Sequence, residues 1–254
     1  MSLLCAASCP EILDGAQRAF AAREFDAAAT GFGRANTACP NQPAILVALG
    51  QVLYVTGKEM EAEQAILKAI SIDGSNTAAL YALGRIYYQQ KRYPEAVTQL
   101  QKTVQLDPTH YKAWDNLGVC YDALNRDSDA LRSFFHSLDL VMKDHQDYDW
   151  AHANLADYFL RRNEYEKAFQ LAAEAARRNP ASARNCFLSG KALVKLEKFD
   201  LSLRWLERAT QLDNTYSEAF YLLSQTYRKM EREEDSTRAL ARFRELSKSP
   251  PARR

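Results

Sequence analysis

Apolar and polar positions follow one another along the chain with the period of an amphipathic α-helix. Leu80, Leu83 and Tyr87 stand at i, i+3 and i+7, which places them on one face of a helix. A polar turn at residues 90–92 ends this stretch. A second helical stretch follows it and stops at Pro108, because proline cannot continue a helix. The pattern predicts two antiparallel helices joined by a short turn.

The same arrangement returns 34 residues later. There the large apolar, small and aromatic residues keep their order, as Trp114, Leu117, Gly118, Tyr121, Ala130 and Phe134. Extended in both directions, the frame divides the chain into repeats at 9–42, 43–76, 77–110, 111–144, 149–182, 183–216 and 217–250. Four extra residues, His145 to Tyr148, interrupt it, either as a solvated loop or as an extra helical turn. Self-similarity at a fixed period is typical of stacked-repeat proteins.

Small residues recur where the two helices of a repeat must approach each other. Gly84 holds the eighth position of its repeat and Ala96 the twentieth, and Gly, Ala or Ser stands at every equivalent place. A branched side chain at either position would push the helices apart. A single hairpin cannot bury its apolar face alone, so we expect the hairpins to stack and share a core.

This unit resembles the tetratricopeptide repeat (TPR), whose W-x₂-L-G-x₂-Y…A-x₃-F pattern the fourth repeat reproduces, and the resemblance covers nearly the whole chain. It implies an all-α fold, a right-handed α-solenoid of seven stacked helix-turn-helix repeats with about fourteen antiparallel helices and a concave groove. Residues 1–250 would form one solenoid and residues 251–254 a disordered tail. The implied function is a scaffold that holds another protein or a peptide in the groove lined by the first helix of each pair.

The resemblance also places particular side chains in the groove. Aromatic residues lead in the first third, amides and carboxylates in the middle, and basic and aromatic residues at the end. The candidate peptide-binding residues are Tyr54, Tyr81, Arg85, Tyr88, Asp115, Asn116, Trp150, Asn154, Asp157, Phe187, Lys191, Lys195, Tyr221 and Arg228. Asn116 and Asn154 share the sixth position of their repeats, where asparagines in related proteins hydrogen-bond a peptide backbone. The alternative is that Asn is simply frequent at that position.

The basic last third suits an acidic segment or a C-terminal carboxylate, although a pair such as Lys191 and Lys195 is often only a solvated helix face. Chaperone-binding relatives use a clamp that needs Lys-x-x-x-Asn at the fifth and ninth positions of a leading repeat. Those positions read Leu13 and Gln17 in the first repeat, and the later repeats do not supply the pair. The sequence therefore argues against a receptor for Hsp70 or Hsp90 tails.

Composition narrows the function further. The 254 residues carry a formal net charge of +1, so the sequence lacks the excess of basic residues typical of nucleic-acid-binding proteins. No apolar run is long enough to span a membrane. No nucleotide-binding or catalytic motif occurs, so we expect no enzyme activity and no cofactor. His145, Asp149 and His152 would share a face if one helix ran through them, but His152 aligns with Trp114 and is interpreted as a packed core residue rather than a metal ligand.

The cysteines suggest a crosslink. Cys9 opens the first helix of repeat one and Cys39 ends the second, so an antiparallel hairpin makes them neighbours. In an oxidising compartment they would form a disulfide, whereas in the cytosol they would be small buried thiols. Localisation stays open: cytoplasmic, or periplasmic or secreted if Met1-Ser2-Leu3 stands in place of a removed signal peptide.

Two functional hypotheses follow. The first is the peptide-binding scaffold. The second is a structural assembly subunit, a homo-oligomer that associates through the ends of the array or its convex face. A detached regulatory domain of an enzyme would need a catalytic partner that this sequence does not contain.

Overall fold

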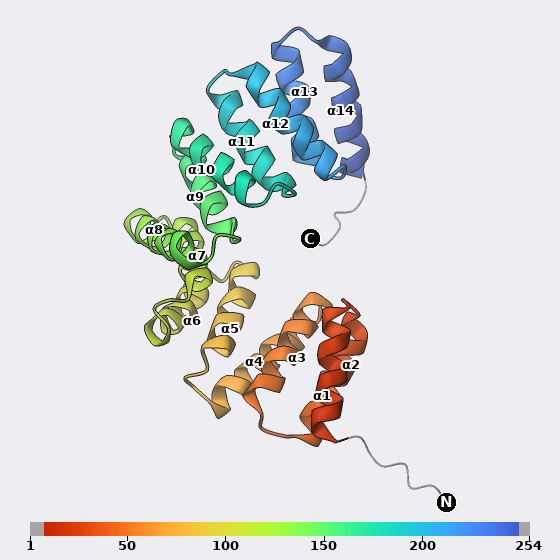
Figure 1. Cartoon of the computed structure of the whole chain (residues 1–254), viewed down its shortest axis with the longest axis vertical. Helices are drawn as coiled ribbons and strands as arrows, with labels where there is room; N and C mark the ends of the chain where they lie inside the picture. The colour runs from red at the N-terminus through yellow and green to blue at the C-terminus, as the bar shows by residue number, and fades with distance from the viewer. Residues whose placement is uncertain (1–7, 249–254) are drawn as a thin grey trace, which may run out of the picture. The chain divides into compact units, whose positions relative to one another are not determined.

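The computed structural model describes residues 8–248, and in that range it consists of helices without strands (Figure 1). The helices are α1 Cys9–Ala21, α2 Phe25–Ala38, α3 Pro43–Val55, α4 Glu59–Ile72, α5 Thr77–Gln89, α6 Tyr93–Leu106, α7 Tyr111–Ala123, α8 Asp127–Asp144, α9 Trp150–Arg161, α10 Tyr165–Arg178, α11 Ala183–Lys195, α12 Phe199–Leu212, α13 Ser217–Lys229 and α14 Glu233–Lys248. The all-α class expected from the sequence is confirmed. Met1-Ser2-Leu3 and the tail at 251–254 lie outside the described residues.

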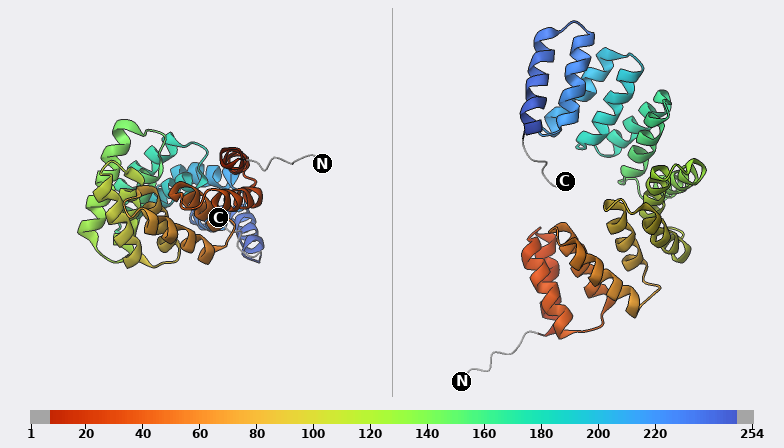
Figure 2. Two further views of the ribbon diagram at one scale, coloured as in Figure 1. Left: turned by 90° about the horizontal axis from the view of Figure 1, so that it is seen from below. Right: turned by 180° about the vertical axis from the view of Figure 1, so that it is seen from behind.

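The chain divides into two compact units, Met1–Ser133 and Phe134–Arg254. Inside each unit the first helix of a hairpin packs against the second, as α1 does against α2, α3 against α4, α5 against α6, α9 against α10, α11 against α12 and α13 against α14, and successive pairs stack on one another (Figure 2). The first helices also contact each other, α3 with α5 and α5 with α7 in one unit, α9 with α11 and α11 with α13 in the other. Each unit is therefore a stack of helical hairpins.

The insertion makes a helix longer, although His145 to Tyr148 themselves lie after the end of that helix at Asp144. Helix α8 has 18 residues, whereas α6, the second helix of the preceding repeat, has 14. The additional helical turn is followed by a short non-helical stretch, and α9 begins at Trp150 with Asp149 as its N-cap. Helix α9 is thus one residue shorter than the 13-residue first helices α7 and α11.

The eighth position of the repeat requires a small residue for steric reasons. A Cβ added to Gly84 would lie 2.8 Å from Cγ of Leu100, and one added to Gly190 would lie 2.7 Å from Cγ of Leu206. Real Cβ atoms do not approach so closely, so a side chain at either glycine would force the facing leucine, or the helix that carries it, to shift. The facing Ala96, at the twentieth position, is fully buried.

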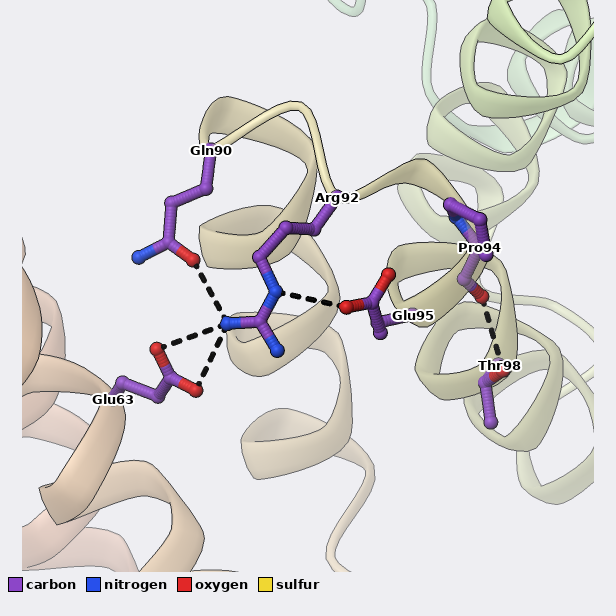
Figure 3. A network of polar contacts seen from close by, with 6 residues as sticks. All are labelled: Glu63, Gln90, Arg92, Pro94, Glu95 and Thr98. Atoms are coloured by element: carbon purple, nitrogen blue, oxygen red, sulfur yellow. Dashed lines mark hydrogen bonds and ion pairs between the residues drawn. The ribbon is translucent and has the colours of Figure 1, made fainter.

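A recurring arginine closes the turn between the helices of a hairpin. The guanidinium of Arg92 lies 4.0 Å from the ring centroid of Tyr87 and donates hydrogen bonds to Glu95 (3.0 Å), Gln90 (3.2 Å) and, on α4 of the preceding hairpin, Glu63 (3.2 and 3.4 Å). Figure 3 shows these carboxylate and amide groups converging on the one guanidinium. The contact to Glu63 joins two successive repeats, which the sequence pattern did not predict.

The first hairpin carries a covalent link. Cys9 at the start of α1 and Cys39 after the end of α2 are joined as a disulfide, with Cα atoms 6.1 Å apart. Helix α1 also begins with a capping box, in which the Ser8 backbone N–H donates to Glu11 Oε2 at 2.7 Å. Both features hold the N-terminal end of α1 in place.

Candidate functional site

The first unit contains a cleft on the side formed by its first helices, which we call the first-helix face. The cleft has a volume of about 190 Å³. Three successive first helices, α1, α3 and α5, supply its lining, which consists of Phe20, Gln51, Tyr54, Val55, Tyr81, Ala82, Arg85, Ile86 and Gln89. Three of the predicted groove residues, Tyr54, Tyr81 and Arg85, therefore come together in one hollow.

Tyr81 is held in a defined position at this cleft. Its hydroxyl accepts a hydrogen bond from Asn116 Nδ2 at 3.4 Å, and its ring packs against His110 with centroids 4.5 Å apart. The guanidinium of Arg85 lies 5.9 Å from the Tyr81 ring centroid. Burial raises the pKa of Tyr81, and it also raises the pKa of Tyr54, which is less deeply buried. Both hydroxyls therefore remain neutral hydrogen-bonding groups.

Arg85 leaves a positive charge at the cleft. Its side chain is exposed, and within residues 8–248 it forms no ion pair with a carboxylate. The amides of Gln51 and Gln89 lie in the same lining. The cleft thus combines aromatic surface, one unpaired cation and amide groups that can both donate and accept hydrogen bonds.

Two predicted groove residues of this unit behave differently. Asp115 was expected to face a ligand, but only 1 % of its surface is exposed, so that expectation is wrong. It lies close enough to Tyr81 to help raise the pKa of that tyrosine. Tyr88 is half-buried and packs against Tyr93, with ring centroids 6.1 Å apart. Neither residue lines the cleft.

Six lining residues were not among the predicted candidates: Phe20, Gln51, Val55, Ala82, Ile86 and Gln89. Ile86 on α5 is 4 % exposed and forms part of the lining. Gln89 holds the thirteenth position of its repeat, as Val55 does in the repeat before. Comparing equivalent positions between adjacent repeats would have identified Gln89 from the sequence.

In the second unit, Trp150, Asn154 and Arg184 form a cluster across two adjacent first helices. The Trp150 side chain on α9 is 51 % exposed. Arg184 on α11 places its guanidinium 4.8 Å from the Trp150 ring centroid and donates a hydrogen bond from Nη2 to Asn154 Oδ1 at 2.8 Å. Beside them Asp157 forms an ion pair with Arg161. The amide proposed for a peptide backbone is therefore engaged by Arg184 in this state.

The remaining predicted residues of this unit lie along α11 and α13. Phe187 is half-buried against Tyr216, with centroids 4.9 Å apart, and Lys191 Nζ lies 5.9 Å from the Phe187 ring. Tyr221 is 44 % exposed and packs on Phe243 at 5.0 Å. Lys195 and Arg228 are exposed. Within the described residues, no hydrogen bond, ion pair or ring contact joins Tyr221 or Arg228 to the other predicted groove residues.

A buried polar cluster lies next to the fifth repeat. Asp149, which caps α9, accepts hydrogen bonds from Asn185 Nδ2 at 2.6 Å and Asn179 Nδ2 at 3.2 Å. His152 is 4 % exposed, and burial, followed by repulsion from Arg178, lowers its pKa to about 4. It is a neutral core residue, as the alignment with Trp114 indicated. Because α8 ends before His145 and α9 begins only at Trp150, no single helix carries both histidines.

The two free thiols between residues 8 and 248 are not reactive groups. Burial raises the pKa of Cys120 to about 12 and also raises that of Cys186, so neither is a thiolate near neutral pH. No group of three His, Cys, Asp or Glu side chains suited to a metal ion occurs between residues 8 and 248. In the same range, none of the helices has both the length and the apolar character that crossing a bilayer requires.

The architecture defines the class of protein, an α-solenoid of repeated helical hairpins. Sequence models of the tetratricopeptide repeat match residues 13–79, 77–110, 113–147 and 183–216. The chain therefore belongs to the tetratricopeptide repeat family. A comparison with curated protein sequences found no match.

Solved structures share the fold at low sequence identity. A tetratricopeptide repeat protein from Parabacteroides merdae is 16% identical with a TM-score of 0.71, over 94% of this chain and 93% of that one. Pseudomonas aeruginosa pilF is 15% identical with a TM-score of 0.71, over 82% of this chain and 93% of that one. The APC/C hetero-tetramer Cut9-Hcn1 gives a TM-score of 0.78 at 17% identity, over 86% of this chain but only 43% of that one. At these identities the likeness establishes the fold alone.

Proposed function

We propose that this protein is a non-catalytic scaffold that holds an extended segment of another protein against its first-helix face. The observation that carries the proposal is the cleft of about 190 Å³ in the first unit, where three successive first helices place Tyr54, Tyr81 and Arg85 around one hollow. A hollow of this size suits a side chain of a bound peptide rather than a large cofactor.

The lining matches the needs of a peptide. The two tyrosines offer large contact areas at low entropic cost, which makes such residues frequent hot spots in interfaces. Gln51 and Gln89 can each donate and accept, as one peptide unit requires. Arg85, without a carboxylate partner, supplies a donor for a backbone carbonyl or an acidic side chain. An extended segment would therefore anchor one side chain in the hollow and hydrogen-bond along it.

The comparisons support the general role. Tetratricopeptide repeat proteins bind other proteins, and one structural neighbour, Cut9, is solved in a hetero-tetramer with Hcn1. That neighbour's partner carries no information about the partner of this chain.

The proposal is tested by selecting peptides from a random display library on the full chain and measuring binding of the selected peptides. Tyr54→Ala and Arg85→Glu are expected to weaken binding by about tenfold or more, as expected for hot-spot residues. The matched control is Met60→Ala on α4, which removes a side chain that is 80% exposed on a second helix. If the cleft variants bind as the wild type does, the first-unit cleft is not the site.

The second candidate function is a structural subunit that assembles through its second helices. Large apolar side chains are exposed there, including Met60 and Leu67 on α4, Leu106 on α6 and Phe135 on α8. Light scattering at increasing concentration tests this candidate: a strict monomer at all concentrations contradicts it, whereas an oligomer that Leu106→Asp dissociates supports it.

A further inference from the structure

The first helices of the second unit carry an excess of positive charge. Helices α9, α11 and α13 contain six cations but two carboxylates, and the charged residues are Arg161, Arg184, Lys191, Lys195, Arg228, Lys229, Asp157 and Glu218. The first helices of the other unit, α1, α3, α5 and α7, contain three cations and four carboxylates. The charge is thus concentrated in one unit of a chain whose formal net charge is only +1.

Most of these six cations form no ion pair in the part of the chain that the structure describes. Lys191, Lys195, Arg228 and Lys229 form no ion pair within residues 8–248. Second helices of the same unit do pair their charges, as Arg177 does with Glu174 and Arg242 with Glu245. Asp157, the carboxylate in the midst of the cations, is already paired with Arg161. The positive charge is therefore left for a ligand.

The cations of α11 lie on one side of that helix. Along α11, Arg184, Lys191 and Lys195 are seven and four residues apart, spacings that put all three on one side of the helix, where Phe187 also stands. Helix α11 contacts α9 on one flank and α13 on the other (Figure 1). The contacts of Arg184 with Trp150 and Asn154 show that this side of α11 continues onto α9.

We call a group of cations and aromatic side chains on these first helices the basic face, and define it as Arg184, Lys191, Lys195, Arg228 and Lys229, together with the aromatic side chains of Trp150, Phe187 and Tyr221 on the same three helices. Basic residues in the last turn of a helix interact favourably with the helix dipole. This interaction accounts in part for the presence of Lys195, Arg228 and Lys229. Arg184 and Lys191 lie outside the last turn of α11, so the dipole does not account for them. Like charges gathered without partners repel one another, and an anionic ligand relieves that repulsion.

We propose that the basic face binds an acidic, extended protein segment in which Asp or Glu residues alternate with apolar ones. The proposal rests on the proposed function and specifies the kind of partner that the second unit recognises. Carboxylates of the segment would pair with Lys191, Lys195 and Arg228, and its apolar side chains would contact Trp150 and Phe187. A nucleic-acid strand fits less well, because Asp157 and Glu218 within these helices would repel a backbone charged at every unit.

The test measures fluorescence anisotropy of two labelled peptides with the full chain, one in which Glu and Asp alternate with Leu, and one with Gln and Asn in their place. The acidic peptide is expected to bind, and the neutral peptide at least about tenfold more weakly. The double variant Lys191→Glu with Arg228→Glu is expected to lose at least about tenfold in affinity for the acidic peptide. Lys195→Ala with Lys229→Ala, which truncates two exposed side chains, should weaken binding in the same direction without affecting folding.

The matched control makes the same charge change elsewhere in the unit: Arg204→Glu on α12 with Arg244→Glu on α14, both exposed and without ion pairs in the described residues. Equal loss in the control overturns the assignment to the basic face, as does equal binding of the neutral peptide. Equal competition by a thymidine oligonucleotide at matched charge would overturn the choice of a protein segment. If Tyr54→Ala weakens binding of the library-selected peptides but the double charge-reversal variant does not, this inference fails. The proposed function is then still supported.

Discussion

The hydroxyl of Tyr227 donates a hydrogen bond to Glu207 Oε1 at 2.6 Å, and so ties the first helix of the last hairpin to the second helix of the hairpin before it. The same joint occurs in the other unit, where the hydroxyl of Tyr121 accepts a hydrogen bond from Gln101 Nε2 at 2.8 Å. In both cases an arginine covers the ring, Arg232 at 4.5 Å and Arg126 at 4.6 Å from the centroid. The aromatic residue of the repeat pattern thus joins neighbouring hairpins.

The first prediction concerns this joint. Tyr227→Phe removes the hydroxyl and leaves Glu207 without its donor, so the free energy of unfolding should fall by about 1–3 kcal/mol. Urea denaturation followed by circular dichroism measures the change. Tyr165→Phe, whose hydroxyl donates only to an exposed Asn163, is the control and should change little. Equal effects of the two substitutions would contradict the special role of the joint.

The joint also gives a pH dependence. Burial, followed by the hydrogen bond to Glu207, raises the pKa of Tyr227 to about 12, above the ordinary value near 10. Because the folded-state pKa is the higher one, the stabilisation is complete below pH ~10 and is lost as the pH rises toward ~12. In thermal melts across this pH range, the melting temperature of Tyr227→Phe should fall less than that of the wild type. This difference would link the loss of stability to the Tyr227 hydroxyl.

A second prediction uses two glycines in different surroundings. Gly190→Ala would place a Cβ 2.7 Å from Cγ of Leu206, and the overpacking should cost about 1–3 kcal/mol. Gly33→Ala on α2 meets nothing within 4 Å, so it should stabilise the protein by about 0.5–1 kcal/mol through helix propensity. Melting temperatures of the two variants should therefore move in opposite directions.

A third prediction concerns Cys9 and Cys39. Thiol titration of the unfolded protein without reductant should find three thiols, two fewer than the five cysteines of the sequence. Reduction should then lower the stability of the first hairpin by about 3–4 kcal/mol, the value expected for closing a loop of this length. Cys9→Ser should reproduce the loss and be insensitive to reductant. Five free thiols would contradict the crosslink.

The repeat frame could be predicted because its causes are local. Helical periodicity, the small residue at Gly84 and the stop at Pro108 each act within one hairpin, and the hairpin recurs in phase. The contact of Arg92 with Glu63 could not be predicted in this way, because it joins two repeats and depends on which side chain the preceding repeat places there. A residue's position in the repeat predicts the side of the helix on which it lies, but not how far neighbouring side chains bury it. For that reason Asp115 was wrongly predicted to be at the surface.

The last prediction follows from His152. Burial is the largest cause of its lowered pKa of about 4, and Arg178 adds repulsion, while Glu174 and Asp149 oppose the shift only in part. Because the folded-state pKa lies below the ordinary value near 6.5, the unfolded chain takes up the proton first. The stabilisation is therefore complete above pH ~6.5 and is lost as the pH falls toward ~4.

The free energy of unfolding should decline over this window in the wild type and decline less steeply in His152→Gln, whatever the cost of that substitution at pH ~7. His136→Gln, which changes an exposed histidine on α8, is the control for the loss of one histidine. Parallel slopes for the wild type and His152→Gln would show that the acid sensitivity arises elsewhere.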